Sequence, residues 1–429
     1  MITYLKRNPL IAILVLAFLL RILYTFGYAR GIMGIAPEKE ETDGYHLIAE
    51  NLYHGYGYRL VLERPPTLER PPGYPLFLYL LFELFGIRYE IAQFSHALLG
   101  VLCCWILFHL GKWIHSDKLG LTCAFLLAIY PPSIEYSARL YSENFYFPLF
   151  LAFAYFFCRS SWLGSVGNGF LTGLLWGASI LTRGTLLLLP LVIPFGIAFS
   201  KHHRVLSRWS KWSIPAILGA ALIVFPWTYR NYLLTESFVP VSSWGWAPFY
   251  HGIQVSKRML EWGDLYRVDK DAAKTRYEIV LKRLYDGDEA KAYASPKDYL
   301  KHEKVAQELV MEELKANPLG AVGRGFLGIF FTWFQTLGAK LRVFSLIIHL
   351  PLMVLFVWGA FLMAKKHHDA FVRAYPALGL ILYVNLFQAF VYPHVRYMAP
   401  AISLSFIFSG FVLYEIFQNK LSFFSKSVN

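Results

Sequence analysis

Acidic residues and cysteines are scarce in this chain. Its 429 residues include 28 Asp and Glu against 41 Lys and Arg, and only four cysteines, all within apolar runs. Cysteines placed in this way indicate neither a disulfide framework nor a Cys-x-x-Cys metal site. A Walker A sequence and an H-E-x-x-H sequence are also absent. These sequences are the usual signatures of a nucleotide-driven transporter and of a zinc protease, so their absence argues against both classes of protein.

Apolar sequence fills the chain instead. Hydrophobic residues make up 56% of the chain and aromatic residues 18%, and the mean hydropathy is +0.42. Runs such as 9–29 and 346–364 are long enough to cross the hydrocarbon core of a bilayer. We therefore predict an all-α polytopic membrane protein. No small-residue cleavage site follows the first run, so we interpret that run as a retained anchor.

The basic residues predict the orientation. The net charge is +13, and Lys and Arg cluster in short segments between the apolar runs, where the positive-inside rule places them. We therefore expect both termini in the cytoplasm, membrane lipids as partners, and no nucleic-acid partner. Hydropathy predicts about ten spans, at 8–27, 91–111, 119–134, 144–160, 168–183, 184–200, 213–230, 343–364, 371–391 and 396–417.

Two long segments then lie on the outer face, 28–90 and 231–342. The apolar stretches 75–86 and 319–337 within them are expected to be interfacial or re-entrant helices, because two further crossings would break the parity of the spans. The sequence thus predicts three parts: an N-terminal transmembrane module whose first outer loop carries the site, an extramembrane subdomain with an interfacial helix, and C-terminal transmembrane helices, over 1–230, 231–342 and 343–429.

The second outer segment contains a polar stretch. Residues 257–316 are charged and helix-prone, and the clearest amphipathic helix lies over 297–318. They predict a small helical subdomain outside the membrane. His251 and His302 have no partners at metal-ligand spacing, so we interpret them as surface histidines.

The first outer segment contains the sequence ETDGYHLIAENL at 41–52. Thr42 is the expected N-cap of a helix that Gly55 would end. Asp43 would lie in the first turn, where the helix dipole favours an ionised carboxylate. Such an acid could act as a base. The alternative is that Asp43 and Glu41 merely cap the helix.

The sequence LERPPTLERPPGYPLF at 62–77 places an arginine before each proline pair. Proline restricts its own backbone and that of the residue before it, so Arg64 and Arg70 are expected to be held in extended conformation. Guanidinium groups held near the outer headgroups suit a phosphate. The alternative is that both arginines anchor the loop to anionic lipid.

Other charged residues stand at the outer ends of spans. Glu143 begins one span, and Arg139, four residues earlier, could simply pair with it. Arg183 lies at an outer turn, and Arg396 begins the last span. Each alone is typical of an interface anchor. Together, acids and arginines from separate segments fall on one side of the membrane, and they predict a pocket with carboxylates for proton transfer and guanidiniums for an anion.

Six segments, in this order, resemble those of bacterial GT-C glycosyltransferases of the protein O-mannosyltransferase and aminoarabinose transferase type (glycosyltransferase family 39). They are TDGYHLIAENLYHGYGY, PTLERPPGYPLFL, LYSENFYF, LTRGTLLLLP, PWTYRNYLLTESFVPVSS and RYMAP. The resemblance covers most of the chain. It implies a helical bundle with about 10–12 transmembrane helices in a bacterial inner membrane, with juxtamembrane helices in the first outer loop and the active site facing the exterior.

The resemblance also implies an activity. It would be the inverting transfer of a hexose or pentose from a polyprenyl-phosphate donor, such as an undecaprenyl-phosphate sugar, to a hydroxyl of a lipid, glycan or protein. Asp43 and Glu143 would be catalytic, and Arg70 and Arg396 would contact the donor phosphate, to which we add Arg64. We expect further substrate contacts from Tyr45, Tyr74, Arg139, Arg183, His394 and Tyr397.

One departure from the family pattern concerns the acids. Many relatives carry an Asp-Glu pair in the first loop, but here Asp43 is followed by Gly44. The second acid could be Glu40, Glu41 or Glu143, and the need for a divalent cation (Mg or Mn) stays open, although no His/Cys set indicates a metal. Two other classes of function are considered: a transporter or flippase of a lipid-linked saccharide, and an O-antigen ligase or polymerase using a diphosphate-linked donor.

Overall fold

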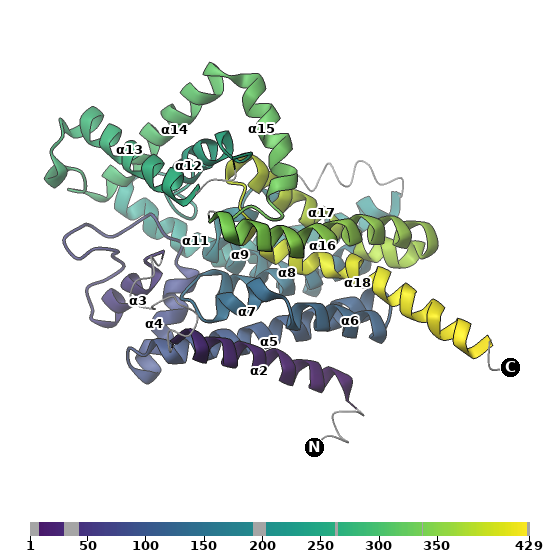
Figure 1. Cartoon of the computed structure of the whole chain (residues 1–429). Helices are drawn as coiled ribbons and strands as arrows, with labels where there is room; N and C mark the ends of the chain where they lie inside the picture. Colours follow the sequence, from purple (N-terminus) through teal and green to yellow (C-terminus); the bar gives the residue numbers. More distant parts are fainter. Residues whose placement is uncertain (1–7, 30–42, 192–202, 262–264, 337, 427–429) are drawn as a thin grey trace.

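The computed structural model describes residues 8–29, 43–191, 203–261, 265–336 and 338–426. The regular elements in these ranges are helices (Figure 1). The predicted all-α class is therefore confirmed. Long helices lie side by side in a bundle, and α12, α13 and α14 stand together at one end of it (Figure 1).

The elements fall into long bundle helices and shorter ones. The bundle contains α2 (Pro9–Ala29), α5 (Tyr89–Ile114), α6 (Asp117–Ala128), α8 (Glu143–Leu163), α9 (Val166–Thr182), α11 (His203–Thr235), α16 (Ala339–Lys366), α17 (His368–Val391) and α18 (Val395–Lys426). The others are α3 (Tyr45–Tyr53), α4 (Gly73–Phe85), α7 (Pro131–Ser137), η2 (Gly184–Leu186), α12 (Trp246–Lys257), α13 (Leu265–Tyr285), η3 (Glu289–Lys291), α14 (Pro296–Ala316) and α15 (Pro318–Phe331).

The protein is an integral membrane protein with several spans. Six described helices are long and apolar enough to cross a bilayer, namely α2, α5, α11, α16, α17 and α18. A seventh span arises if α6 and α7, bent by 56° at their break, count as one. This is fewer than the predicted ten. The predicted spans at 144–160 and 168–183 form α8 and α9, which are not among the six, and the one at 184–200 extends beyond the described residues.

The two stretches predicted to lie along the membrane form short apolar helices. α4 has 13 residues and α15 has 14, which is less than the roughly 20 residues that a helical crossing needs. Asn317 separates α15 from α14, and its side chain accepts from the Gly320 N–H at 2.8 Å. It thereby satisfies one of the backbone donors that a helix N-terminus leaves without an intrahelical partner.

α15 also contains the sequence Gly-Arg-Gly-Phe-Leu-Gly at 323–328, which has the G-x-G-x-x-G spacing of a dinucleotide-binding turn. Here the spacing lies inside a helix and serves packing. A Cβ atom at Gly325 would clash with the ring of Phe390, and one at Gly328 would clash with the Ala389 carbonyl. The glycines therefore let α15 approach α17, and Asn385 holds the contact by donating to the Ile329 carbonyl at 3.1 Å.

α9 and α11 approach each other in the same way. A Cβ atom at Gly169, Gly173 or Gly177 would clash with backbone atoms of α11. Small residues at every fourth position allow membrane helices to pack at backbone contact. This packing fixes the C-terminal end of α9, and with it the position of Arg183, which follows the helix directly.

The helices α12, α13 and α14 stand together at one end of the bundle (Figure 1), and we call them the outer helical unit. They have an apolar core of their own. Its buried members are Tyr250, Ile253, Ala272, Val280, Tyr285, Ala292, Val305, Leu309 and Val310. The prediction that His251 and His302 lie at the surface is wrong, because they are only 9% and 6% exposed. His302 Nε2 lies 3.2 Å from the Tyr285 hydroxyl, and His251 Nδ1 lies 3.7 Å from Asp269 Oδ1. Both histidines therefore help to hold this unit together.

A buried arginine holds the break between α6 and α7. Arg21 of α2 is fully buried. Its guanidinium donates to the carbonyls of Leu127 and Ala128 at 3.5 Å each, to Ser133 Oγ at 2.8 Å and to the Ala17 carbonyl at 2.9 Å. The first two carbonyls end α6, where the helix dipole favours a positive charge. Arg21 thus caps α6 at the point where the chain turns into α7, which leads to the segment before Glu143.

We expect Arg21→Leu to destabilise the protein by about 2 kcal/mol, because the hydrogen bonds from the charged guanidinium are lost and leucine offers the carbonyls no donor in their place. The measurement is thermal unfolding of the purified protein in lipid nanodiscs. Arg88→Leu is the control, since Arg88 is exposed at the start of α5. Equal unfolding temperatures for the two variants would contradict the capping role.

Candidate active site

Asp43 lies before α3 rather than in it. The helix begins at Tyr45, and Gly44 precedes it with a φ of 76°, a left-handed conformation that favours glycine. The predicted place of Asp43 in the first helical turn is therefore wrong. Thr42, the predicted cap, lies outside the described residues, as do Glu40 and Glu41. The side chain of Asp43 contacts Arg396 of α18 instead.

Arg396, near the start of α18, is the centre of a cluster of charged side chains that includes Asp43 and Glu143. Its Nη2 donates to Asp43 Oδ2 and, at 2.9 Å, to Glu143 Oε2, while its Nε donates to Glu143 Oε1. The guanidinium lies 3.7 Å from the ring centroid of Tyr141. One arginine therefore joins the two predicted catalytic acids, which come from different outer segments of the sequence.

Glu143, the first residue of α8, is the most enclosed member. Its side chain is 1% exposed, and Arg183 Nη1 lies 2.7 Å from its Oε1. The same nitrogen donates to Ser142 Oγ at 3.2 Å. A buried carboxylate is stable only with such partners. The alternative that Glu143 merely pairs with Arg139 is wrong, because Arg139 pairs with Glu135 at 2.9 Å.

Arg70 reaches the cluster from the segment between α3 and α4. Its Nε donates to the backbone carbonyl of Asp43 at 2.9 Å. Its guanidinium lies 5.8 Å from the ring centroid of Tyr45 and 5.0 Å from that of Trp244. Within the described ranges Arg70 forms no ion pair with a carboxylate, so its charge is not neutralised by a neighbouring acid.

Three further predicted residues border the cluster. The ring of Tyr397 lies 4.6 Å from the Arg183 guanidinium, and His394 Nδ1 accepts from the Arg396 backbone N–H at 3.0 Å. Tyr74 is fully buried behind Tyr45, with the two rings edge to face at 5.6 Å. Tyr74 therefore supports the cluster from within the protein.

Arg64 does not join the cluster. Its guanidinium lies over the ring of Tyr293, 3.8 Å from the centroid, at the outer helical unit. The two arginines of the repeated Glu-Arg-Pro-Pro sequence thus have different surroundings, and the structure gives Arg64 no contact with Asp43, Glu143 or Arg396.

The sequence reasoning missed three residues of the cluster. Tyr141 and Ser142 directly precede Glu143, so their position in the quoted segment LYSENFYF could have identified them. Trp244 directly follows the quoted segment PWTYRNYLLTESFVPVSS, but nothing in that segment indicates a contact with Arg70. Only the fold brings it to Arg70.

The electrostatics of the cluster favour an anion. Burial opposes the ionisation of Asp43, but the guanidinium groups of Arg396, Arg70 and Arg183 outweigh it and hold the pKa of Asp43 below its usual value. Burial, together with the nearby arginines, lowers the pKa of His394 to about 3, so this histidine is neutral at pH 7. Three guanidiniums therefore face two carboxylates, and one positive charge remains.

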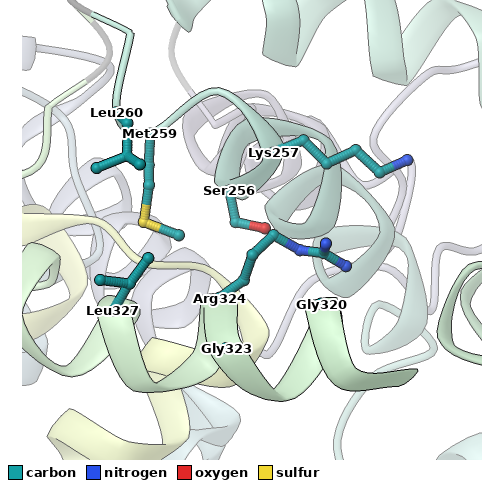
Figure 2. A pocket seen from close by; sticks show the side chains of 8 residues that line it. All are labelled: Ser256, Lys257, Met259, Leu260, Gly320, Gly323, Arg324 and Leu327. Atoms are coloured by element: carbon teal, nitrogen blue, oxygen red, sulfur yellow. The ribbon is translucent and has the colours of Figure 1, made fainter. Parts of the chain in front are cut away.

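The described residues contain no group of three or more His, Cys, Asp or Glu side chains that could hold a metal ion. A pocket of about 360 Å³ lies away from the cluster, between the end of α12 and α15. Figure 2 shows Lys257 and Arg324 at this pocket beside the apolar Met259, Leu260 and Leu327. None of the predicted site residues lines it.

Residues 69–229 match the family described as dolichyl-phosphate-mannose-protein mannosyltransferase. The match covers less than half of the chain. The matched segment includes Arg70, Glu143 and Arg183, and it ends before Arg396. The resemblance stated from the sequence is thus confirmed by a comparison that covers part of the cluster. No curated protein matches the chain significantly by sequence.

Solved structures show what the fold of this chain resembles. The apo oligosaccharyltransferase of Archaeoglobus fulgidus has 12% sequence identity and a TM-score of 0.58, over 98% of this chain and 53% of its own. AglB from the same organism, in complex with an inhibitory peptide and a dolichol-phosphate, has 15% identity and a TM-score of 0.57, over 99% and 52%. The chain spans about half the length of these proteins, and its fold is of the GT-C type.

ArnT from Cupriavidus metallidurans, bound to undecaprenyl phosphate, is a more distant structural match to the chain. Its sequence identity is 12% and its TM-score is 0.43, over 93% of this chain and 77% of its own. The fold assignment depends on the archaeal structures, which superpose better.

We expect Glu143→Gln to destabilise the protein by about 3 kcal/mol, because two partly buried guanidiniums, Arg183 and Arg396, then lose the buried carboxylate that pairs with both of them. Unfolding in lipid nanodiscs measures the change. Glu135→Gln is the matched control: it breaks a pair whose acid is 36% exposed, so its effect should stay below about 1 kcal/mol. Similar losses for both variants would show that the Glu143 contacts do not hold the cluster together.

Proposed function

We propose that the protein is an inverting membrane glycosyltransferase that moves a sugar from a polyprenyl-phosphate donor to a hydroxyl of a lipid, glycan or protein. The observation that carries the proposal is the charge of the cluster. Three arginines against two carboxylates, with a neutral His394, leave one positive charge. A sugar phosphodiester has one negative charge, so it completes this balance.

The donor phosphate would bind between Arg70 and Arg396. The guanidinium of Arg70 has no carboxylate partner in the described ranges, and it contacts the main chain of Asp43. The family description names a dolichyl-phosphate donor, and AglB was solved with a dolichol-phosphate. Both support a polyprenyl phosphate as the carrier. We propose that the site faces the exterior of a bacterial inner membrane, with both termini in the cytoplasm and the prenyl chain in the lipid.

Asp43 would act as the base. The acceptor oxygen attacks the anomeric carbon, the bond from that carbon to the phosphate oxygen breaks, and the acceptor proton passes to the Asp43 carboxylate. Prenyl phosphate leaves with one more negative charge than the donor phosphate had. Arg70 and Arg396 would stabilise that charge where it develops. Glu143 would hold Arg396 in place rather than take the proton, since Arg183 and Arg396 occupy its oxygens.

Donor binding would also release the base. Arg396 Nη2 serves Asp43 and Glu143 together, so a phosphate oxygen that takes this donor competes with Asp43. Glu143 keeps Arg396 through its second contact at Nε. An Asp43 oxygen then becomes available to the acceptor hydroxyl. This exchange predicts that the donor binds before the acceptor is activated.

The test is transfer by the purified protein in lipid nanodiscs, supplied with undecaprenyl-phosphate-linked hexoses and pentoses and a lipid extract as acceptor. Release of undecaprenyl phosphate, measured by mass spectrometry, should fall at least about 10²-fold in Asp43→Asn, because general-base catalysis is lost. Binding of undecaprenyl phosphate should persist. Asp117→Asn is the control, since Asp117 is exposed and pairs with Lys112.

Three outcomes would overturn the proposal. Normal release by Asp43→Asn would remove the base from the mechanism. Donor movement across the membrane without release of undecaprenyl phosphate would identify a transporter or flippase instead. Activity with diphosphate-linked oligosaccharides alone would identify a ligase or polymerase, because the site would then bind a more highly charged donor.

The rate should stay insensitive to Asp43 protonation between pH 5 and 8. The arginines hold the pKa of Asp43 below its usual 3.8, and the carboxylate is the active form, so kcat/KM should fall only as the pH drops below about 4. The Arg183→Gln variant loses one of these cations, so burial raises the pKa of Asp43 relative to that in the unchanged protein. The acid limb of the plot of kcat/KM against pH should therefore move to higher pH. An unmoved limb would contradict the assignment of Asp43 as the base.

A further inference from the structure

Trp244 lies between the site and the outer helical unit. Its ring centroid is 5.0 Å from the Arg70 guanidinium and 5.1 Å from that of Arg276 on α13. Arg276 is 8% exposed. Cations near an indole ring are attracted by its quadrupole, most strongly when water is largely excluded. One ring therefore ties the proposed phosphate-binding arginine to a helix outside the bundle.

The backbone on both sides of this contact is held in place. The Ser243 N–H donates to the Leu68 carbonyl at 2.8 Å, which joins the Trp244 segment to the Arg70 segment. The Glu303 carboxylate of α14 accepts from the N–H groups of Gly245 and Trp246. The loop that carries Trp244 is thus fixed by its main chain, and removal of the indole ring does not remove these bonds.

α13 makes a second contact with the other side of the site. Asp269 accepts from the Tyr392 hydroxyl at 3.0 Å. Tyr392 stands in the link between α17 and α18 that leads to Arg396, and its ring lies 5.5 Å from that of Tyr397. Asp269 and Arg276 are seven residues apart, which places them on one face of α13. A single helix face therefore contacts the surroundings of both proposed phosphate-binding arginines.

We propose that Trp244 is a positioning residue that holds the Arg70 guanidinium toward the donor phosphate, and that α13 braces both sides of the phosphate site through Arg276 and Asp269. The inference rests on the proposed function, in which Arg70 binds that phosphate. Without the indole, the contacts that Arg70 keeps among the described residues are its bond to the Asp43 carbonyl and the more distant ring of Tyr45. The guanidinium then samples other rotamers, and phosphate affinity falls.

The experiment measures the affinity of the full-length protein in nanodiscs for undecaprenyl phosphate. Trp244→Leu should weaken binding by about 3- to 30-fold, the range expected for a partly buried cation–π contact. Trp244→Phe should restore part of it, because phenylalanine keeps an aromatic face. Arg276→Gln should weaken binding less than Trp244→Leu. Trp358→Leu is the control, since Trp358 is 59% exposed on α16.

The coupling between Trp244 and Arg70 separates positioning from a general structural effect. If Trp244 acts through Arg70, the double variant Arg70→Gln/Trp244→Leu should bind no more weakly than Arg70→Gln alone. Tyr392→Phe acts on the Arg396 side of the site. In a double variant with Trp244→Leu, the two fold-losses of undecaprenyl phosphate affinity should therefore multiply. In transfer assays Trp244→Leu should raise KM for the donor more than it lowers kcat.

The outcomes distinguish the two levels of the argument. If Arg70→Gln binds undecaprenyl phosphate normally, the proposed role of Arg70 fails, and this inference fails with it. If Arg70→Gln weakens binding but Trp244→Leu does not, or if the losses multiply in the double variant, only the inference is overturned. Should Trp244→Leu fail to fold, Trp244→Phe and Arg276→Gln decide the question, and normal affinity in both overturns the inference.

Discussion

The shared contact of Arg396 with Asp43 and Glu143 is the interaction on which the rest of the site depends. Charges taken out of water are stable only when they are paired and hydrogen-bonded. At the end of an apolar bundle this requirement is strict, and it forces segments that are distant in sequence to meet. The start of α18, the start of α8, the end of α9 and the loop before α3 are all positioned by this pairing. The proposed chemistry uses the same charges, so stability and function depend on one set of contacts.

Close helix packing makes that meeting precise. The glycines of α9 bring its end, and thus Arg183, to a fixed place against α11. Arg21 caps the break between α6 and α7 and so fixes the chain that leads to Glu143. The outer helical unit adds contacts from α13 to Trp244 and Tyr392. The site is therefore held by the bundle and by the outer helices together.

The sequence was sufficient for the class of fold and for the residues at the centre of the site. The position of charges at span ends indicated Glu143, Arg183 and Arg396, because an ionisable residue at a membrane boundary is rare enough to be informative. Asp43 was indicated by its place at the start of an expected amphipathic helix in the first outer segment. The partners of these residues could not be predicted. Local spacing favoured an Arg139–Glu143 pair, whereas the fold gives Glu143 to Arg183 and Arg396 and leaves Arg139 with Glu135.

The remaining errors have the same origin. Arg64 and Arg70 precede identical proline pairs, but one contacts Tyr293 and the other reaches Asp43. The difference is made by what packs against each arginine, which local sequence does not encode. Trp244 was missed for this reason. The ten predicted spans also exceed the candidate spans of the structure, because hydropathy counted α8 and α9, which are not among the six helices that are long and apolar enough to cross a bilayer.

The excess charge explains why such a site should bind its donor before reacting. The cluster has three guanidiniums and two carboxylates, and it lies where water is partly excluded. An anion that enters relieves this imbalance, and it does so best at Arg70, which has no acid of its own within the described part of the chain. In the proposed reaction, the phosphate gains a further negative charge when the anomeric bond breaks, while the Asp43 carboxylate is neutralised by the acceptor proton. The total charge of the site is then unchanged across the reaction. A fixed array of arginines can therefore stabilise donor, transition state and product without moving.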